Sequence, residues 1–190
     1  LITPETKAIA CTIASNVTGQ ILPYKKIAKL CRKYDLCYIA DGAQACGVIP
    51  LKMSDGFNFL CAAGHKGLYG TTGTGLLISD GKYTLSTIVE GGTGTTSDKL
   101  EQPDFMPERL ESGTLNTVGI LALGAGLDYI KKKTLYKIYE HENALCNLFI
   151  KKALKIKGIS IYRKRNCNYV PIVSFNLDYL TAEELTSQLD

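Results

Sequence analysis

The sequence predicts an α/β fold whose sheet is mainly parallel, and three features of the first half of the chain support this. Short apolar segments at residues 7–13, 36–40 and 57–63 are typical of buried strands. A segment with helical periodicity lies between the first two, in the strand–helix–strand order of a right-handed crossover. Polar residues follow each strand directly. Because parallel strands end at one edge of a sheet, where ligands bind in open α/β folds, we expect these residues to gather there.

The crossover helix is expected to begin after Pro23, since proline suits the first turn of a helix. Spacings of three and four residues predict one apolar face made of Ile27, Leu30, Cys31 and Tyr34. A fourth strand is predicted at residues 74–79, with a turn at Asp80-Gly81. It follows the third strand too soon for a crossover helix, so we expect the two to be antiparallel.

The second half of the chain is expected to be more helical. A loop at residues 88–108, rich in Gly, Thr, Ser and Pro, is too long for a simple connection and is predicted to be functional. A helix from Thr117 is predicted by an apolar face of Ile120, Leu123, Leu127 and Ile130. A second helix is expected at residues 135–156, with Gly158 ending it.

The last segments predict a small α+β unit. Residues 159–162 and 170–176 are expected to form strands. Thr181 and Glu184 have the spacing of a capping box, which predicts the start of a final helix. We therefore expect a large unit over residues 1–133, followed by a connecting helix and the start of a smaller domain over residues 134–190.

Composition narrows the classes of function. The 190 residues are 45% hydrophobic, 21% charged and carry a net charge of +4, as expected of a globular protein. The basic residues are scattered, so we expect no nucleic-acid partner. No apolar run is long enough to span a membrane, and we expect no membrane partner. Seven cysteines without a Cys-x-x-Cys pair predict a reducing compartment, the cytoplasm, with neither disulfides nor a metal site.

The residues at the strand ends indicate which chemistry to expect. Asp41 follows the second strand and Lys66 the third, within Gly-His-Lys. An amine and a carboxylate at neighbouring strand ends suit pyridoxal phosphate (PLP), because lysine can form a Schiff base and a carboxylate can hold a proton on the pyridine nitrogen. Taken alone, the pair is weak evidence, because an Asp-Gly pair after a strand is more often a simple turn and a lone Gly-His-Lys is more often a solvated lysine in a surface turn. The sequence has no Walker loop, no complete dinucleotide fingerprint and no His-Glu-x-x-His.

Four motifs in order resemble the class V aminotransferase family of PLP enzymes, and most closely its cysteine desulfurase and selenocysteine lyase branch. They lie at residues 15–19, 41–44, 64–70 and 109–116, and the Gly91-Gly92-Thr93-Gly94 loop is similar as well. The resemblance covers residues 8–130 most clearly and implies part of a PLP-transferase large domain.

The resemblance implies a role for each matched residue. Lys66 would bind the cofactor aldehyde, Asp41 would pair with the pyridine nitrogen and Gln44 would bind the phenolic oxygen. His65 would contact the phosphate, and Asn16 would lie near the substrate carboxylate or the phenolic oxygen. Thr114 would reach the phosphate of a neighbouring subunit, which implies a homodimer with a shared site. Two departures from the family pattern are Ala63, where Ser or Thr is frequent, and Thr71, where Pro is frequent.

The family reaction converts L-cysteine, or L-selenocysteine, to L-alanine and leaves the sulfur on an enzyme cysteine as a persulfide, for a possible acceptor protein in iron–sulfur cluster assembly. The family's N-terminal third, its reactive cysteine and a substrate-binding arginine have no counterpart between Leu1 and Asp190. We therefore expect an internal fragment that is inactive alone. Two alternatives stay open: another aminotransferase or PLP-dependent lyase of the family, and a truncated relative that acts as a binding domain.

Overall fold

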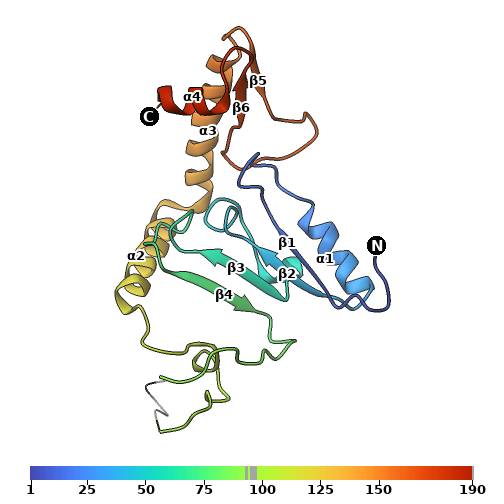
Figure 1. The fold of residues 1–190 in the computed structure, drawn as a ribbon, viewed down its shortest axis with the longest axis vertical. Helices are drawn as coiled ribbons and strands as arrows, with labels where there is room; N and C mark the ends of the chain where they lie inside the picture. Colours follow the sequence, from blue (N-terminus) through green and yellow to red (C-terminus); the bar gives the residue numbers. More distant parts are fainter. Residues whose placement is uncertain (93, 95–97, 190) are drawn as a thin grey trace.

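The computed structural model describes residues 1–92, 94 and 98–189, and it contains two sheets (Figure 1). The larger sheet has the strand order β1-β2-β3-β4, with bounds Ala8–Thr12, Cys37–Asp41, Phe59–Ala63 and Gly75–Ser79. Strands β1, β2 and β3 are parallel, and β4 is antiparallel to β3. Both the mainly parallel sheet and the direction of the fourth strand are confirmed.

Helix α1 (Tyr24–Lys33) forms the crossover between β1 and β2 and covers one face of the sheet (Figure 1). It buries Ala28 and Cys31 in a core that also contains Tyr38 and Phe57. The predicted apolar face was wrong for Leu30 and Tyr34, whose side chains are 39% and 48% exposed. Helix α1 turns the side of Ala28 toward the sheet, and Tyr34 lies just past the last helical residue, at the C-cap.

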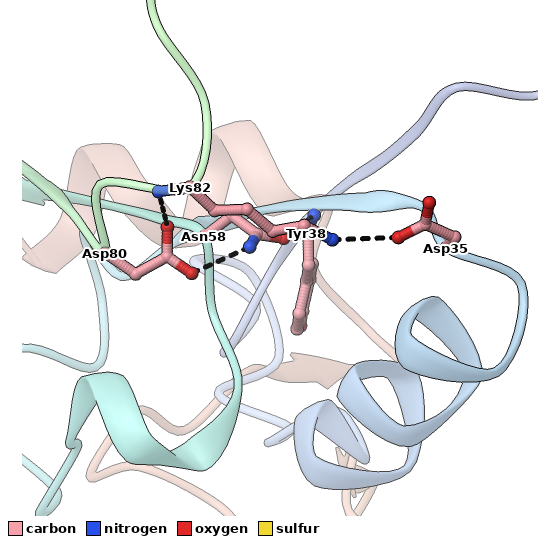
Figure 2. A network of polar contacts seen from close by, with 5 residues as sticks. All are labelled: Asp35, Tyr38, Asn58, Asp80 and Lys82. Carbon is pink, nitrogen blue, oxygen red and sulfur yellow. Dashed lines mark hydrogen bonds and ion pairs between the residues drawn. The ribbon is translucent and has the colours of Figure 1, made fainter.

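A polar network joins the strands at the edge opposite their carboxyl ends (Figure 2). Asn58, just before β3, accepts a hydrogen bond from the Tyr38 backbone N–H at 2.8 Å and donates one to Asp80 at 2.8 Å. Asp80 follows β4 and also accepts from the Lys82 backbone N–H at 2.9 Å. The Lys82 ammonium pairs with Asp35 at 2.8 Å. The network therefore links β2, β3, the β4 turn and the end of α1.

Two long helices follow the sheet. Asn116 caps α2 (Thr117–Lys133) by accepting from the Gly119 N–H at 3.0 Å, and Thr134 separates α2 from α3 (Leu135–Ala153). Figure 1 shows α3 extending from the sheet toward the second unit. Of the face predicted for α2, Leu123 is buried and Ile130 half-buried.

The prediction was wrong for Ile120 and Leu127, which are 49% and 40% exposed. The backbone of α2 approaches the sheet unit through the small residues Gly119 and Gly126, which are buried beside Leu123. The contact face of the helix is thus shifted from the one that the large apolar residues indicated.

The second unit contains β5 (Ile159–Ile161) and β6 (Phe175–Leu177), which are antiparallel, and α4 (Ala182–Leu189). The capping box is confirmed: Glu184 accepts from the Thr181 N–H at 2.8 Å, and the Thr181 hydroxyl accepts from the Glu184 N–H at 3.2 Å. Of the strand predicted at residues 170–176, only the end is a strand. Two of the remaining residues bond to the loop after β1: the Val170 N–H donates to the Gly19 carbonyl at 2.8 Å, and the Ser174 hydroxyl donates to the Val17 carbonyl.

Two short 3-10 helices, Met53–Asp55 and Glu108–Leu110, lie in the connections. In the part of the chain that the structure describes, no helix combines the length and apolar character needed to cross a membrane.

Candidate active site

The loops after β1, β2 and β3 leave the same edge of the sheet. Thr12, the last residue of β1, is in register with Asp41, and Asp41 is in register with Cys61. Strand β3 ends at Ala63, so Lys66 lies three residues beyond its end. Asp41 and Lys66 are both exposed there. The fold therefore brings the segments carrying the predicted acid and the predicted amine out at one edge, as the sequence indicated.

Asp41 is held by its own turn. Its Oδ1 accepts a hydrogen bond from the Ala43 backbone N–H at 2.9 Å, the Asx-type turn that aspartate favours. The Gly42 N–H donates to the Cys61 carbonyl at 2.8 Å, which ties the start of this turn to β3. Among the described residues, no hydrogen bond or ion pair involves the second carboxylate oxygen, Oδ2. This oxygen is therefore available to accept a hydrogen bond from a bound ligand.

Lys66 lies in a closed loop, residues 64–70, which we call the Lys66 loop. The Gly70 N–H donates to the Gly64 carbonyl at 2.8 Å, and the Tyr69 N–H donates to the Lys66 carbonyl at 3.0 Å. Tyr69 adopts a left-handed backbone with φ of 57°. The loop is thus tightly bonded to itself, while the side chains of His65 and Lys66 are exposed.

Gln44 lies in the turn that follows Asp41 and lines a cavity of about 500 Å³. The cavity lies between this turn, helix α3 and the segment after Val170; its other lining residues include Val48, Glu142, Cys146, Phe149 and Ile172. Burial raises the pKa of Glu142, against a smaller lowering by His141. The cavity is not lined by Asp41 or Lys66, so it adjoins the candidate site rather than containing it.

Asn16 and Thr114, the other two predicted site residues, lie outside the two loops that carry Asp41 and Lys66. Asn16 is exposed in the loop after β1, where the Gly19 N–H donates to the Ser15 carbonyl at 3.0 Å. Thr114 is exposed shortly before α2, and the neighbouring Gly113 N–H donates to the Gly91 carbonyl at 3.0 Å. No hydrogen bond among the described residues joins Thr114 to the other five predicted residues. Of the glycine loop noted in the sequence, Thr93 lies outside the described residues.

Two thiols lie close to Asp41. The pKa of Cys46 is raised to about 11, mainly by burial and to a smaller extent by the charges of Asp41 and then Cys61. Burial and then Asp41 also raise the pKa of Cys61. Cys46 packs against two clusters of buried apolar side chains, one that contains Tyr38 and Phe57 and one that contains Leu68 and Leu123. These thiols are therefore held in the neutral form, which is a poor nucleophile.

Three features of this edge were not found from the sequence. The backbones of Gly47 and Gly67 are in direct contact, Gly126 contacts the Lys66 loop from α2, and Glu142 lines the same cavity as Gln44. The glycines were visible as letters, but contacts between distant segments leave no local signal. Within the described residues, no group of three or more His, Cys, Asp or Glu side chains is arranged to hold a metal ion.

Comparisons with known proteins give a consistent result. The family model described as "Aminotransferase class-V" matches residues 1–190. A cysteine desulfurase from Yersinia pseudotuberculosis is 32% identical over 201 aligned positions, which cover 100% of this chain and 48% of that protein. The chain thus spans about half the length of the curated relatives it matches.

Solved structures show the same relationship. The apo structure of a cysteine desulfurase from Thermococcus onnurineus has a TM-score of 0.81 and 28% identity, covering 97% of this chain and 47% of that one. A cysteine desulfurase from Escherichia coli has a TM-score of 0.86 at 22% identity, covering 99% and 47%, and supports the fold alone.

Proposed function

The chain belongs to the class V aminotransferase family. From this premise we propose that it is part of a PLP-dependent cysteine desulfurase. Enzymes of this family use PLP, so PLP is the expected cofactor. The observation that carries the proposal is the shared edge of β2 and β3, where Asp41 ends one strand and Lys66 follows the other. The names of the relatives favour desulfuration over other reactions of the family.

The residues present fit the cofactor. An exposed amine and a carboxylate with one free oxygen leave neighbouring parallel strands, and the hydrogen bond from Ala43 fixes the orientation of that carboxylate. In the proposal, Lys66 binds the cofactor aldehyde covalently and Asp41 holds the proton on the pyridine nitrogen. When bound, PLP withdraws electrons from the α-carbon of the amino-acid substrate.

Four further residues complete the proposed site. Gln44 donates a hydrogen bond to the phenolic oxygen of the cofactor, and His65 contacts its phosphate. Asn16 lies near the substrate carboxylate or near the same phenolic oxygen. Thr114 contacts the cofactor phosphate bound by a second copy of the chain, so the site is shared within a homodimer.

We also propose that residues 1–133 belong to the large domain and that residues 134–190 form the connecting helix and the start of the small domain. Thr134, between α2 and α3, lies at the boundary.

The proposed reaction transfers one sulfur atom. An enzyme thiolate attacks the sulfur of L-cysteine, and the substrate carbon–sulfur bond breaks. The electron pair of that bond stays on carbon, which takes up a proton, so that L-alanine leaves and the enzyme retains a persulfide. Cys46 and Cys61 are unsuitable as this thiolate, because burial raises the pKa of both.

The test uses the full-length protein and Lys66→Ala. The wild type should take up PLP with a new visible absorption band and release alanine and, with a reductant, sulfide from L-cysteine. Lys66→Ala should lose both the band and the activity, whereas Lys29→Ala, at an exposed lysine of α1, should keep both.

The outcomes separate the alternatives. An unchanged band in Lys66→Ala would reject the assignment of the lysine. A wild type that binds PLP but releases no sulfide or alanine would be another aminotransferase or lyase of the family. A wild type that binds no PLP would be a non-catalytic relative.

A further inference from the structure

We propose that Gly47 and Gly126 are positioning residues that fix Lys66 relative to Asp41 by direct backbone contact with the Lys66 loop. The inference rests on the proposed function, because it assigns a purpose to the position of the Lys66 amine. The two glycines come from different elements: Gly47 from the turn that begins at Asp41, and Gly126 from helix α2.

Gly47 joins the two halves of the site. A Cβ on Gly47 would overlap the carbonyl of Gly67 and would lie 2.9 Å from the Leu68 nitrogen. In the reverse direction, a Cβ on Gly67 would lie 2.5 Å from the Cys46 carbonyl oxygen. The nearest atom that each Cβ would meet belongs to the backbone, which cannot rotate away as a side chain can. The segment with Asp41 and Gln44 therefore rests directly against the residue that follows Lys66.

Gly126 makes the matching contact from the other element. A Cβ on Gly126 would overlap the Leu68 carbonyl oxygen and would lie 2.8 Å from the Tyr69 carbonyl carbon. One turn away, Leu123 packs with Leu68 in a small apolar cluster. The Lys66 loop is therefore held between the Asp41 turn and helix α2, at distances that only glycine allows.

The consequence concerns the amine. Because the loop is closed by the bond from Gly70 to Gly64 and clamped at Gly67–Tyr69, the backbone of Lys66 has little freedom to shift. Its side chain is exposed and has no hydrogen-bond partner among the described residues. A fixed amine is what covalent binding of a cofactor opposite Asp41 requires, since misplacing a reacting group by about 1 Å can cost about 100-fold in rate.

The chain offers matched controls. Gly47 and Gly81 have nearly the same left-handed backbone, with φ of 81° and 79°, but a Cβ on Gly81 would meet nothing within 4 Å. Gly81→Ala therefore carries the same backbone strain as Gly47→Ala without the collision. In helix α2, Gly124 is the control for Gly126, because a Cβ on Gly124 would also meet nothing within 4 Å.

The experiment compares the four alanine variants and the wild type in the full-length protein. PLP affinity is measured by titration of the visible band, and the covalent link is measured by borohydride reduction followed by mass analysis of the Lys66 peptide. Hydrogen exchange of residues 64–70 and of β2 is measured without cofactor, and thermal unfolding reports whether each variant folds.

We expect Gly47→Ala and Gly126→Ala to bind PLP at least about tenfold more weakly than Gly81→Ala and Gly124→Ala, because a displaced Lys66 loses alignment. Exchange should rise in residues 64–70 and stay unchanged in β2. If Gly47→Ala fails to fold, Gly126→Ala carries the test.

Equal affinities and equal exchange in the crowded variants and their controls would overturn the inference while leaving the proposed function standing. A wild type that takes up no PLP would reject the proposed function. The exchange of residues 64–70 would then still decide whether the two glycines hold the loop.

Discussion

At the scale of the residue, Asp41 can be tested through its neighbours before any cofactor is added. Its charge helps to raise the pKa of Cys46 and of Cys61, after the larger effect of burial. The two thiols therefore report on the carboxylate. If Asp41 lies where the structure has it, removing its charge has to change their ionisation.

We predict that alkylation of Cys46 by iodoacetamide is slow at neutral pH and rises toward pH 11. The thiolate is the reactive form, and the raised pKa of about 11 keeps the thiol protonated until then. Asp41→Asn removes a negative charge that disfavours the thiolate, so the pKa should fall and the rate at pH 9 should increase. Site-resolved mass spectrometry measures the rate. As a control, Asp128→Asn on α2 should have no effect. If Asp41→Asn leaves the pH dependence of Cys46 alkylation unchanged, Asp41 does not lie close enough to Cys46 to influence it.

The same shift has a consequence for stability. The folded protein keeps the Cys46 proton up to about pH 11, whereas the unfolded chain releases it near the ordinary value of 9.0. Between these values the unfolded state binds fewer protons, so the free energy of unfolding should decrease as the pH rises.

Single residues were predictable from the sequence where they follow a strand. The positions of Asp41 and Lys66 at the strand ends were predicted because short apolar runs between turn residues indicate where strands end. Gly47 and Gly126 were missed because each acts on a segment about 20 or more positions away, and the sequence pattern reports only local geometry.

At the scale of the element, periodicity located the helices better than it oriented them. Helix α1 begins after Pro23 and α2 begins at Thr117, as predicted. The buried faces differ because contact is made by small residues, Ala28 in α1 and Gly126 in α2, which allow close backbone approach. Large residues such as Leu30 then lie at the exposed margin of the contact between the helix and the sheet.

We predict that Asn58→Ala destabilises the sheet by about 1–3 kcal/mol, because it leaves a buried backbone N–H of Tyr38 without its acceptor. The change also removes the hydrogen bond to Asp80 (Figure 2). Denaturant unfolding followed by circular dichroism gives the free energy. Lys82→Ala breaks only the exposed pair with Asp35 in the same network, and should change the stability much less. Equal losses in the two variants would show that the Asn58 bridge has no special role.

At the scale of the whole molecule, the larger sheet ends in an uncovered strand. All five residues of β4 are exposed, and Leu76, Leu77 and Ile78 are 37%, 50% and 38% exposed. Natural edge strands usually carry charges or bulges that prevent pairing with other chains, and β4 has no charged residue. The exposed apolar surface of β4 is therefore suited to being covered by further polypeptide.

We predict that the 190-residue chain by itself binds a hydrophobic dye such as ANS and elutes in gel filtration above its mass of 20.7 kDa. Leu77→Lys should reduce both signals, because a charge on an edge strand opposes pairing while the strand stays in place. Leu30→Lys, which replaces an exposed leucine of α1 away from this edge, is the matched control and should change neither. Equal behaviour of the two variants would mean that association uses another surface, and a monomer without dye binding would mean that β4 needs no cover. If Leu77→Lys alone restores a monomer, the uncovered edge of β4 is the surface through which this chain meets other polypeptide.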